Sequence, residues 1–512
     1  MPTVAKLAVQ AATYAIDKAY DYLLPDELPG RVGCRVLVPF GRGNRLSEGM
    51  ILSLGQSAPA KPLKAVRSLL DDEPVVTEKE LRLALWMSRR YFCTFYDALH
   101  TILPAAVWYR YREIWSLRQP PLPDAPEREQ AVAQLLQDGP LTEDKLCQAL
   151  GDDLPPLLRR MEKAGLLTHT MEQQQKVRDR VVTFVSLSVP AEQALTLAGR
   201  SAKRKDVVSF LAQNGETALH DLRYFTGAAK RTVDDLCRLG AVSLHEQEEY
   251  RISEKQYAVK ATDITLNNEQ QRVCDTLLRQ IDRGEAGVTL LRGVTGSGKT
   301  MVYIRLAQLL LARGKSVMIL VPEIALTPQM MARFTAYFGA QVALLHSGLR
   351  MTERYDQYKR IRRGEARIVL GTRSAVFAPL VDLGLIVMDE EQESSYESEN
   401  APCYHARDVA KYRCAQEGAR LLLGSATPTV ETAWHAEQGD YGLLELRRRF
   451  NQQALPHVIV ADLRQELRQG RSTIISQPLY DELQKNMSAG EQSILFLNRR
   501  GSSRQLLCPQ CG

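Results

Sequence analysis

The stretch GVTGSGKT, residues 293–300, constrains the fold more than any other part of the chain. It matches G-x-x-x-x-G-K-T, follows the apolar run VTLL directly and opens the helical pattern MVYIRLAQLLL. Glycines in such a loop let backbone amides surround phosphate oxygens, and the helix N-terminus favours negative charge. The motif therefore predicts a nucleoside triphosphate site, with Lys299 on the β- and γ-phosphates and Thr300 on Mg²⁺. The predicted nucleotide contacts are Gly293, Val294, Thr295, Gly296, Ser297, Gly298, Lys299 and Thr300.

Apolar runs alternate with helical patterns from about residue 264 onward. Six runs indicate buried strands: VTLLRG, SVMILVP, VALLHS, RIVLGT, LIVMDE and RLLLGS. Buried strands separated by helices are typical of a parallel sheet that is covered on both faces. We therefore predict an α/β fold with a P-loop lobe over residues 263–452. Residues 453–512 contain PHVIVADLR, a helical pattern at 478–488 and SILFLNRRG, which indicate the start of a second α/β lobe.

Two further segments supply chemistry that a triphosphate site needs. LIVMDEE, residues 385–391, is an apolar strand that ends in carboxylates. We predict that Asp389 lies beside the Mg²⁺ shell and that Glu390 polarises the attacking water. An acidic pair after a strand is equally typical of a solvated strand end, but its place downstream of a P-loop favours catalysis. GSATPT, residues 424–429, ends the next strand, where small hydroxyl side chains can sense the γ-phosphate.

The first half of the chain has a different pattern. Short strands with Gly, Pro and Asn breakers predict a small β-rich domain over residues 1–105, closed by one helix at about 77–100. After a Pro-rich linker at 118–129, two segments repeat the order helix, short helix, helix and apolar segment. This order predicts one or two winged-helix units in the region 106–262. Such units bind nucleic acid in some proteins and other proteins in others, and the sequence leaves both open.

Charge and cysteine content narrow the class of protein. A net charge of +6 permits a polyanionic partner without requiring one. The nine cysteines are odd in number and mostly scattered, which favours reduced thiols in the cytoplasm over a disulfide framework. The N-terminus has no signal-peptide pattern, and no apolar run is long enough for a membrane span. Cys508 and Cys511 form a C-x-x-C pair, which fits half a zinc site or a redox pair.

Several segments, taken in order, closely resemble a known family. They are VPEIALTPQ (321–329), LHSGLR (345–350), GTRSAVFAPL (371–380), DEEQESSYESENAPCYHARDVA (389–410), GSATPTVET (424–432) and ILFLNRRG (494–501). The Ser-Ala-Thr motif is that of superfamily 2 helicases, and the whole set is similar to the bacterial replication-restart (primosomal) DNA helicases, the PriA family. Near the N-terminus, YDYLLPDEL, GCRVLVPFG and LKAV resemble that family's domain for DNA 3′ ends. The resemblance covers essentially the whole chain.

This resemblance implies an ATP-dependent helicase that moves 3′ to 5′ on DNA. It implies recognition of stalled or abandoned replication forks and the start of replication restart by primosome assembly. Implied cofactors are ATP, Mg²⁺ and Zn²⁺, and implied ligands are branched DNA forks and single-stranded DNA. Implied protein partners are the single-stranded-DNA-binding protein and other primosome proteins, including the replicative helicase and its loader. The family also implies a monomer in the cytoplasm, associated with the nucleoid, with no membrane partner.

The family pattern also assigns roles to individual residues. Gln270 matches a glutamine that reads adenine. Aromatic side chains would stack on bases and basic groups would meet phosphate at the predicted DNA contacts. These contacts are Tyr20, Asp21, Gly41 and Lys64 in a pocket for the 3′-terminal nucleotide, Arg373 on the DNA path, and Tyr396, Tyr404 and Arg407 in an aromatic-rich loop. For the loop aromatics, burial inside the lobe is the competing interpretation.

Two departures from the family pattern bear on activity. Gln392 stands where the family usually has histidine, so this position cannot be protonated. Cys508 and Cys511 match the first two ligands of an eight-cysteine module that binds two zinc ions, so the chain is expected to be truncated within that module. A fork-binding fragment with little ATPase, because the second lobe is incomplete, is therefore an alternative function. Another superfamily 2 translocase is a third.

Overall fold

The computed structural model describes residues 2–57, 62–121, 125–151, 153–175, 181–248, 250–251, 263–450, 457–468 and 475–496. The chain forms two compact units, residues 1–451 and 452–512. Among the described residues, no helix is both long enough and apolar enough to cross a bilayer.

A seven-stranded parallel sheet forms the lobe that carries the P-loop. Its order is β14-β15-β13-β16-β17-β12-β18. All six predicted strands are present, which confirms the α/β fold. The sequence does not predict β18, since this strand lies at the sheet edge and its Leu443 side chain is exposed. The strands are β12 (Gly287–Gly293), β13 (Ser316–Leu320), β14 (Val342–Leu345), β15 (Ile368–Gly371), β16 (Leu383–Asp389), β17 (Arg420–Ser425) and β18 (Gly442–Leu446).

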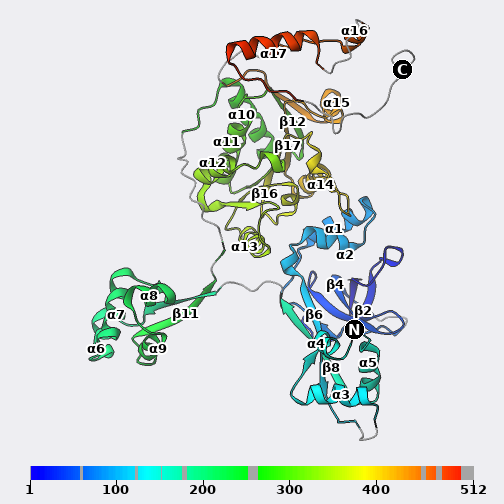
Figure 1. Ribbon diagram of the computed structural model, residues 1–512, viewed down its shortest axis with the longest axis vertical. Coiled ribbons are helices and arrows are strands. Elements are labelled where there is room, and N and C mark those ends of the chain that lie inside the picture. The colour runs from blue at the N-terminus through cyan, green and yellow to red at the C-terminus, as the bar shows by residue number, and fades with distance from the viewer. Residues whose placement is uncertain are drawn as a thin grey trace. The chain divides into compact units, whose positions relative to one another are not determined.

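Helices cover both faces of this sheet (Figure 1). Successive side chains of a strand point to opposite faces, so Ile319 and Val387 join one core while Met318 and Met388 join the other. The first face packs against α10 (Asn268–Asp282), α11 (Lys299–Ala312) and α12 (Pro328–Phe338). The second packs against α13 (Met351–Arg362), α14 (Ala406–Glu417) and α15 (Val430–Gln438).

The N-terminal domain is a five-stranded antiparallel sheet in the order β2-β1-β4-β3-β5, followed by two helices. The prediction of one helix at 77–100 is wrong, because the chain turns between α1 (Glu78–Arg90) and α2 (Phe95–Ile102). Phe92 has a φ of 52°, which no helix accommodates, and Thr94 starts α2 through a capping box with Asp97. The strands are β1 (Thr3–Val9), β2 (Tyr20–Leu24), β3 (Arg35–Phe40), β4 (Arg45–Gln56) and β5 (Ser68–Leu69).

Two small units follow in the region predicted to be winged-helix, each with a three-stranded sheet, helices and its own core. Trp115 is fully buried in the first core, so part of the aromatic segment after the N-terminal domain packs inward. The first unit contains β6 (Tyr109–Leu117), α3 (Glu127–Gln137), β7 (Leu141–Thr142), α4 (Glu143–Leu150), α5 (Pro155–Lys163) and β8 (Leu167–Gln175). The second contains β9 (Val181–Leu187), α6 (Ala191–Ala198), α7 (Ala202–Asn214), β10 (Thr217–Ala218), α8 (Leu219–Thr226), α9 (Lys230–Arg238) and β11 (Val242–Glu248).

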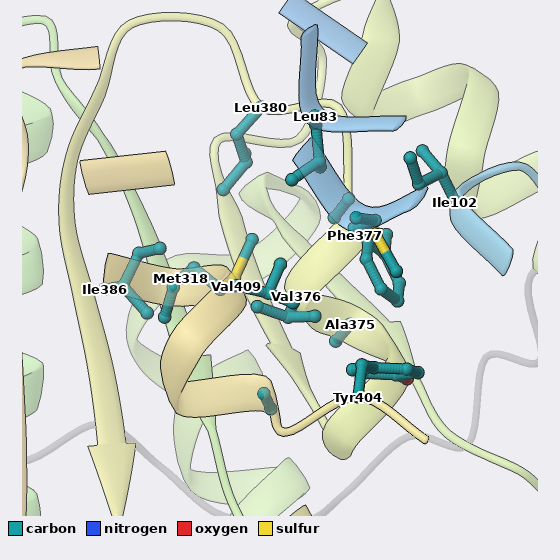
Figure 2. Close-up of a cluster of buried hydrophobic side chains, with 14 of the residues drawn as sticks. Leu83, Ile102, Met318, Ala375, Val376, Phe377, Leu380, Ile386, Tyr404 and Val409 are labelled. Atoms are coloured by element: carbon teal, nitrogen blue, oxygen red, sulfur yellow. The ribbon is translucent and has the colours of Figure 1, made fainter. Parts of the chain in front are cut away.

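The N-terminal helices and the P-loop lobe share one hydrophobic core. Figure 2 shows Leu83 of α1 and Ile102 of α2 in the same buried cluster as Phe377, which ends the short 3-10 helix Arg373–Phe377 of the lobe. Arg362 adds a polar link, since its guanidinium donates to the backbone oxygens of Pro74 and Val75 at 2.6 and 2.8 Å. Apolar and polar contacts thus both join the N-terminal domain to the lobe.

Helix α14 makes a second contact with α1. The Tyr412 ring stacks on Trp86 with 4.5 Å between ring centroids, and its hydroxyl donates to the backbone oxygen of Arg82 at 3.2 Å. Asp408, one turn earlier, lies 3.4 Å from the Arg90 guanidinium. These contacts tie the N-terminal domain directly to a helix of the lobe.

The second unit contains α16 (Leu463–Arg468) and α17 (Gln477–Ala489), which confirms the helix predicted at 478–488. The strands predicted within PHVIVADLR and SILFLNRRG are not formed at 457–462 and 491–496, and residues 497–501 lie outside the described residues. A strand exists only when paired with a neighbour, and these two described segments have none. Val460 and Phe496 are accordingly 91% and 89% exposed.

We predict that Phe377→Ala destabilises the first unit strongly. The ring is 5% exposed, and removing a buried Phe ring costs about 3–5 kcal/mol of unfolding free energy. Chemical denaturation would measure the change. Phe92→Ala is the matched control, because that ring is 78% exposed and its removal should cost no more than about 0.5 kcal/mol. Equal effects of the two substitutions would contradict the shared core.

Candidate functional site

The P-loop connects β12 to α11 and has the geometry of an anion cradle. Gly296 and Gly298 have φ of 78° and 82°, a region that L-residues rarely adopt. Gly298 caps α11 without a side-chain hydrogen bond, so the first amides of this helix are left for another acceptor. The Ser297 hydroxyl is buried without a hydrogen-bond partner among the described residues. A phosphate group fits this set of unused donors.

The three predicted catalytic residues lie together. The Lys299 ammonium is 3.4 Å from a carboxylate oxygen of Glu390 and donates to the backbone oxygen of Gly293 at 3.3 Å. Asp389 ends β16, next to Glu390, whose φ of 48° marks a sharp turn after the strand. A lysine beside two carboxylates fits the charge of a magnesium–triphosphate complex.

Two tyrosine hydroxyls hold Asp389, one at its carboxylate and one at its backbone oxygen. Tyr303 of α11 donates its hydroxyl to Asp389 Oδ1 at 2.8 Å, and the Tyr396 hydroxyl lies 2.6 Å from the Asp389 backbone oxygen. Burial raises the pKa of the Asp389 carboxyl, and the hydrogen bond from Tyr303 lowers it. The sequence gives no signal for Tyr303, because a tyrosine in an apolar helix has the pattern of an ordinary core residue.

Gln392 bridges two motifs. Its amide nitrogen donates to Glu390 Oε2 at 2.9 Å, and its amide oxygen accepts from the Ser425 hydroxyl at 2.6 Å. Since Ser425 belongs to the Ser-Ala-Thr motif, the carboxylate predicted to be catalytic is connected to the strand end that was predicted to sense the γ-phosphate. An amide can donate and accept at once, so this bridge needs no change of protonation.

Glu391 is a functional-site residue that the sequence does not single out. Its carboxylate is buried, accepts from the Thr429 backbone amide at 2.7 Å and from the Thr432 hydroxyl at 3.0 Å, and pairs with Arg407 at 3.0 Å. The Arg407 guanidinium also donates to both threonine hydroxyls, and its side chain stays 19% exposed, so the contact with DNA phosphate stays a prediction. These bonds join α14 to Glu391, just after β16, and to the start of α15.

Gln270 does not present its amide to a base. The side chain is buried, accepts from the Asn267 backbone amide at 2.9 Å and donates to the Ser297 backbone oxygen at 2.9 Å. A Cβ at Gly298 would overlap the Gln270 amide nitrogen. The prediction that Gln270 reads adenine is therefore corrected, and the structure gives it the role of bracing the P-loop.

Two of the aromatic-loop predictions are also corrected. Tyr396 is 0% exposed and Tyr404 is 4% exposed, with the Tyr404 ring packed edge-on against Phe377. A base cannot stack on rings that are covered in this way. Arg373 remains half-buried, and its guanidinium lies 5.9 Å from the Tyr404 ring and donates to the backbone oxygen of Glu397.

The predicted 3′-end pocket is partly assembled. Lys64 donates to the Gly41 backbone oxygen at 2.7 Å, and Tyr20 packs edge-on against Phe40, the residue before Gly41. Asp21 follows Tyr20 on β2 with its side chain exposed. The structure thus brings Tyr20, Gly41 and Lys64 to one end of the sheet, with Asp21 adjacent in the chain.

The remaining predicted residues lie as follows. Val294 donates its amide to Leu446 at the end of β18, Thr295 is exposed within the loop, and Thr300 lies in the first turn of α11. Cys508 and Cys511 lie outside the described residues. Elsewhere in the described part of the chain, no group of three or more His, Cys, Asp or Glu side chains could hold a metal ion.

Two family models match the chain. The model described as "3'DNA-binding domain (3'BD)" of PriA matches residues 6–104, and the model described as "DEAD/DEAH box helicase" matches residues 267–434. The first match covers the five-stranded domain with α1 and α2. The second covers the P-loop, the β16 carboxylates and the segment after β17. Residues 267–434 are therefore similar to a DEAD/DEAH box helicase domain, and residues 6–104 are similar to the PriA 3′ DNA-binding domain.

Three relatives are similar in sequence to this chain along nearly its whole length. The replication restart protein PriA of Bacillus subtilis is 36% identical over 99% of this chain and 64% of its own length. The proteins of the same name from Synechocystis and Haemophilus influenzae are 33% and 30% identical, over 96% and 99% of this chain and 61% and 60% of their own lengths. The chain thus spans less than two thirds of these relatives. The resemblance to the PriA family is confirmed, and the chain is a homologue of replication restart protein PriA.

We predict that Gln270→Leu lowers stability and weakens nucleotide binding. The substitution keeps the volume but leaves the Ser297 oxygen and the Asn267 amide without their partner, at a cost of roughly 1–3 kcal/mol. Thermal unfolding and titration with a fluorescent ATP analogue would measure both effects. Gln271→Leu, at an exposed neighbouring position, is the control. Altered discrimination between ATP and GTP with unchanged stability would instead support adenine reading.

Proposed function

We propose that this chain is the ATP-binding and fork-recognising part of a 3′-to-5′ DNA helicase that starts replication restart. The observation that carries the proposal is the joining of a 3′ DNA-binding domain and a DEAD/DEAH box lobe through one hydrophobic core. A domain that binds a DNA end and a lobe that binds ATP are the two parts that an end-recognising DNA motor needs.

The ATP site acts through groups already in place. Lys299 and the free amides of α11 bind and orient the phosphates, while Asp389 and Thr300 hold Mg²⁺, which neutralises charge on the β- and γ-oxygens when bound. Glu390 orients the attacking water. Because Gln392 connects Glu390 to Ser425, movement of the water-orienting carboxylate reaches the Ser-Ala-Thr segment. This connection is the proposed route from hydrolysis to the DNA-contacting surface.

DNA contacts are assigned to the residues that face solvent. In the N-terminal domain Tyr20 stacks on the terminal base, Asp21 accepts from the 3′-hydroxyl and Lys64 meets phosphate, with Gly41 giving close access. A 3′-phosphate is excluded because it would meet the Asp21 carboxylate. Arg373 contributes on the helicase lobe, beside the loop that it braces.

The relatives are named replication restart proteins, and the proposal extends their role to this chain. The ligands are branched forks and single-stranded DNA, and the chain acts as a cytoplasmic, nucleoid-associated monomer. The single-stranded-DNA-binding protein, the replicative helicase and its loader, together with other primosome proteins, are the proposed partners. Cys508 and Cys511 are proposed as two ligands of a zinc ion.

Lys299→Ala tests the motor part of the proposal. The 512-residue chain is expected to hydrolyse ATP in the presence of forked DNA, and the substitution should abolish turnover while fork binding persists, because the 3′ DNA-binding domain is untouched. Phosphate release and fluorescence anisotropy with a labelled fork would measure the two activities. Fork binding by a wild-type chain without DNA-stimulated turnover would support the fork-binding fragment instead.

Asp21→Asn tests the end-binding part. The wild-type chain is expected to prefer forks with a 3′-hydroxyl over forks with a 3′-phosphate, and the substitution should reduce this preference because the repelling charge is lost. Competition binding with both ends would measure it. Asp26→Asn, at another exposed carboxylate of the same domain, should leave the preference unchanged. Equal wild-type binding to both ends would count against Asp21.

A further inference from the structure

We propose that Tyr303 is a positioning residue for the magnesium-binding carboxylate, and that position 424 is glycine because the Tyr303 hydroxyl occupies the space of its side chain. The proposal deepens the ATP site and rests on the proposed function. It concerns a buried hydroxyl that would act through Asp389.

Tyr303 lies one helical turn after Lys299 on α11. Its side chain is fully buried, and its hydroxyl donates to Asp389 Oδ1 at 2.8 Å. With Oδ1 engaged in this way, the carboxylate cannot turn freely, and Oδ2 is the oxygen left for a metal.

Gly424 faces this hydrogen bond from the neighbouring strand. It pairs with Asp389 in the register of β16 and β17, and its backbone oxygen accepts from the Glu391 amide at 3.1 Å. A Cβ built on Gly424 would overlap the Tyr303 hydroxyl oxygen and lie 3.1 Å from both the ring carbon Cζ and Asp389 Oδ1. No side chain fits there while the hydroxyl is present.

Three motifs therefore meet at one hydroxyl group. The hydroxyl belongs to Tyr303 on the P-loop helix, and Asp389 at the end of β16 accepts its hydrogen bond. Gly424 in the Ser-Ala-Thr strand has no side chain that would overlap it. Because interiors are closely packed, the bond fixes the distance from the phosphate-binding lysine to the metal-binding carboxylate. Packing alone does not require a tyrosine at position 303, since a phenylalanine would fill the same cavity except for the oxygen.

The first test measures nucleotide affinity rather than turnover. A fluorescent ATP analogue would be titrated with Mg²⁺ and with EDTA. Tyr303→Phe is expected to weaken binding about tenfold or more with Mg²⁺, the size expected for losing one hydrogen bond to a charged group, and to leave binding in EDTA unchanged. Tyr358→Phe is the matched control, because Tyr358 is also buried but lies on α13, away from the site.

The second test is a rescue. Gly424→Ala alone should lower the melting temperature and Mg²⁺-dependent affinity, because the new methyl group collides with the hydroxyl. Adding Tyr303→Phe removes the oxygen and leaves a ring carbon at 3.1 Å, so the double variant should melt at a higher temperature than Gly424→Ala. This non-additivity would show that the two residues share one space.

The outcomes separate this inference from the proposed function. If the wild-type chain binds the nucleotide and the Tyr303→Phe variant binds it with the same Mg²⁺-dependent affinity, the positioning role is overturned. The proposed ATP site is unaffected by that outcome. A double variant no more stable than Gly424→Ala would overturn the packing argument. A wild-type chain that binds no nucleotide would overturn the proposed ATP site, and with it the positioning role, whereas the melting temperatures would still decide the packing.

Discussion

The site depends on one property of parallel sheets: all strands end at the same edge. In this lobe β12, β16 and β17 lie next to one another, so the P-loop, the carboxylates and the Ser-Ala-Thr segment emerge together although they are far apart in the sequence. The arrangement is stable only because helices bury both faces, and the cores on the two faces hold the strands in register. The catalytic geometry therefore follows from the packing.

Several polar side chains at this edge are hydrogen-bonded to one another. Glu391 is 1% exposed, a position that would cost several kcal/mol without partners. Arg407 and two threonines supply those partners, and Gln392 does the same for Glu390. Removing Arg407 would leave the buried Glu391 carboxylate without its cationic partner, so this ion pair favours one conformation of the segments after β16 and β17. Rigidity of this kind is what a site for phosphoryl transfer requires.

Sequence patterns predict what is periodic or contiguous. The P-loop, six of the strands and the helix in the second unit were accessible because apolar runs and glycine spacing report local structure. The positions of Gln270, Tyr396 and Tyr404 in the structure were not accessible in this way, because a match to a family motif identifies a residue but does not show whether its side chain is buried. The break at Phe92 and the pairing of Tyr303 with Gly424 depend on a single backbone angle and on a contact between distant segments. No local pattern encodes either.

Within the first unit, helix α14 contacts both the candidate nucleotide site and the N-terminal domain. Its first turn holds Arg407 against the Glu391 carboxylate, and its second holds Tyr412 against Trp86 of the N-terminal domain. A twelve-residue helix is about 18 Å long and stiff along its axis. A rotation of α14 at its N-terminal end would therefore also move its contact with α1. Helix α14 thus connects the carboxylate after β16 directly to α1 in the domain that matches the PriA 3′ DNA-binding model.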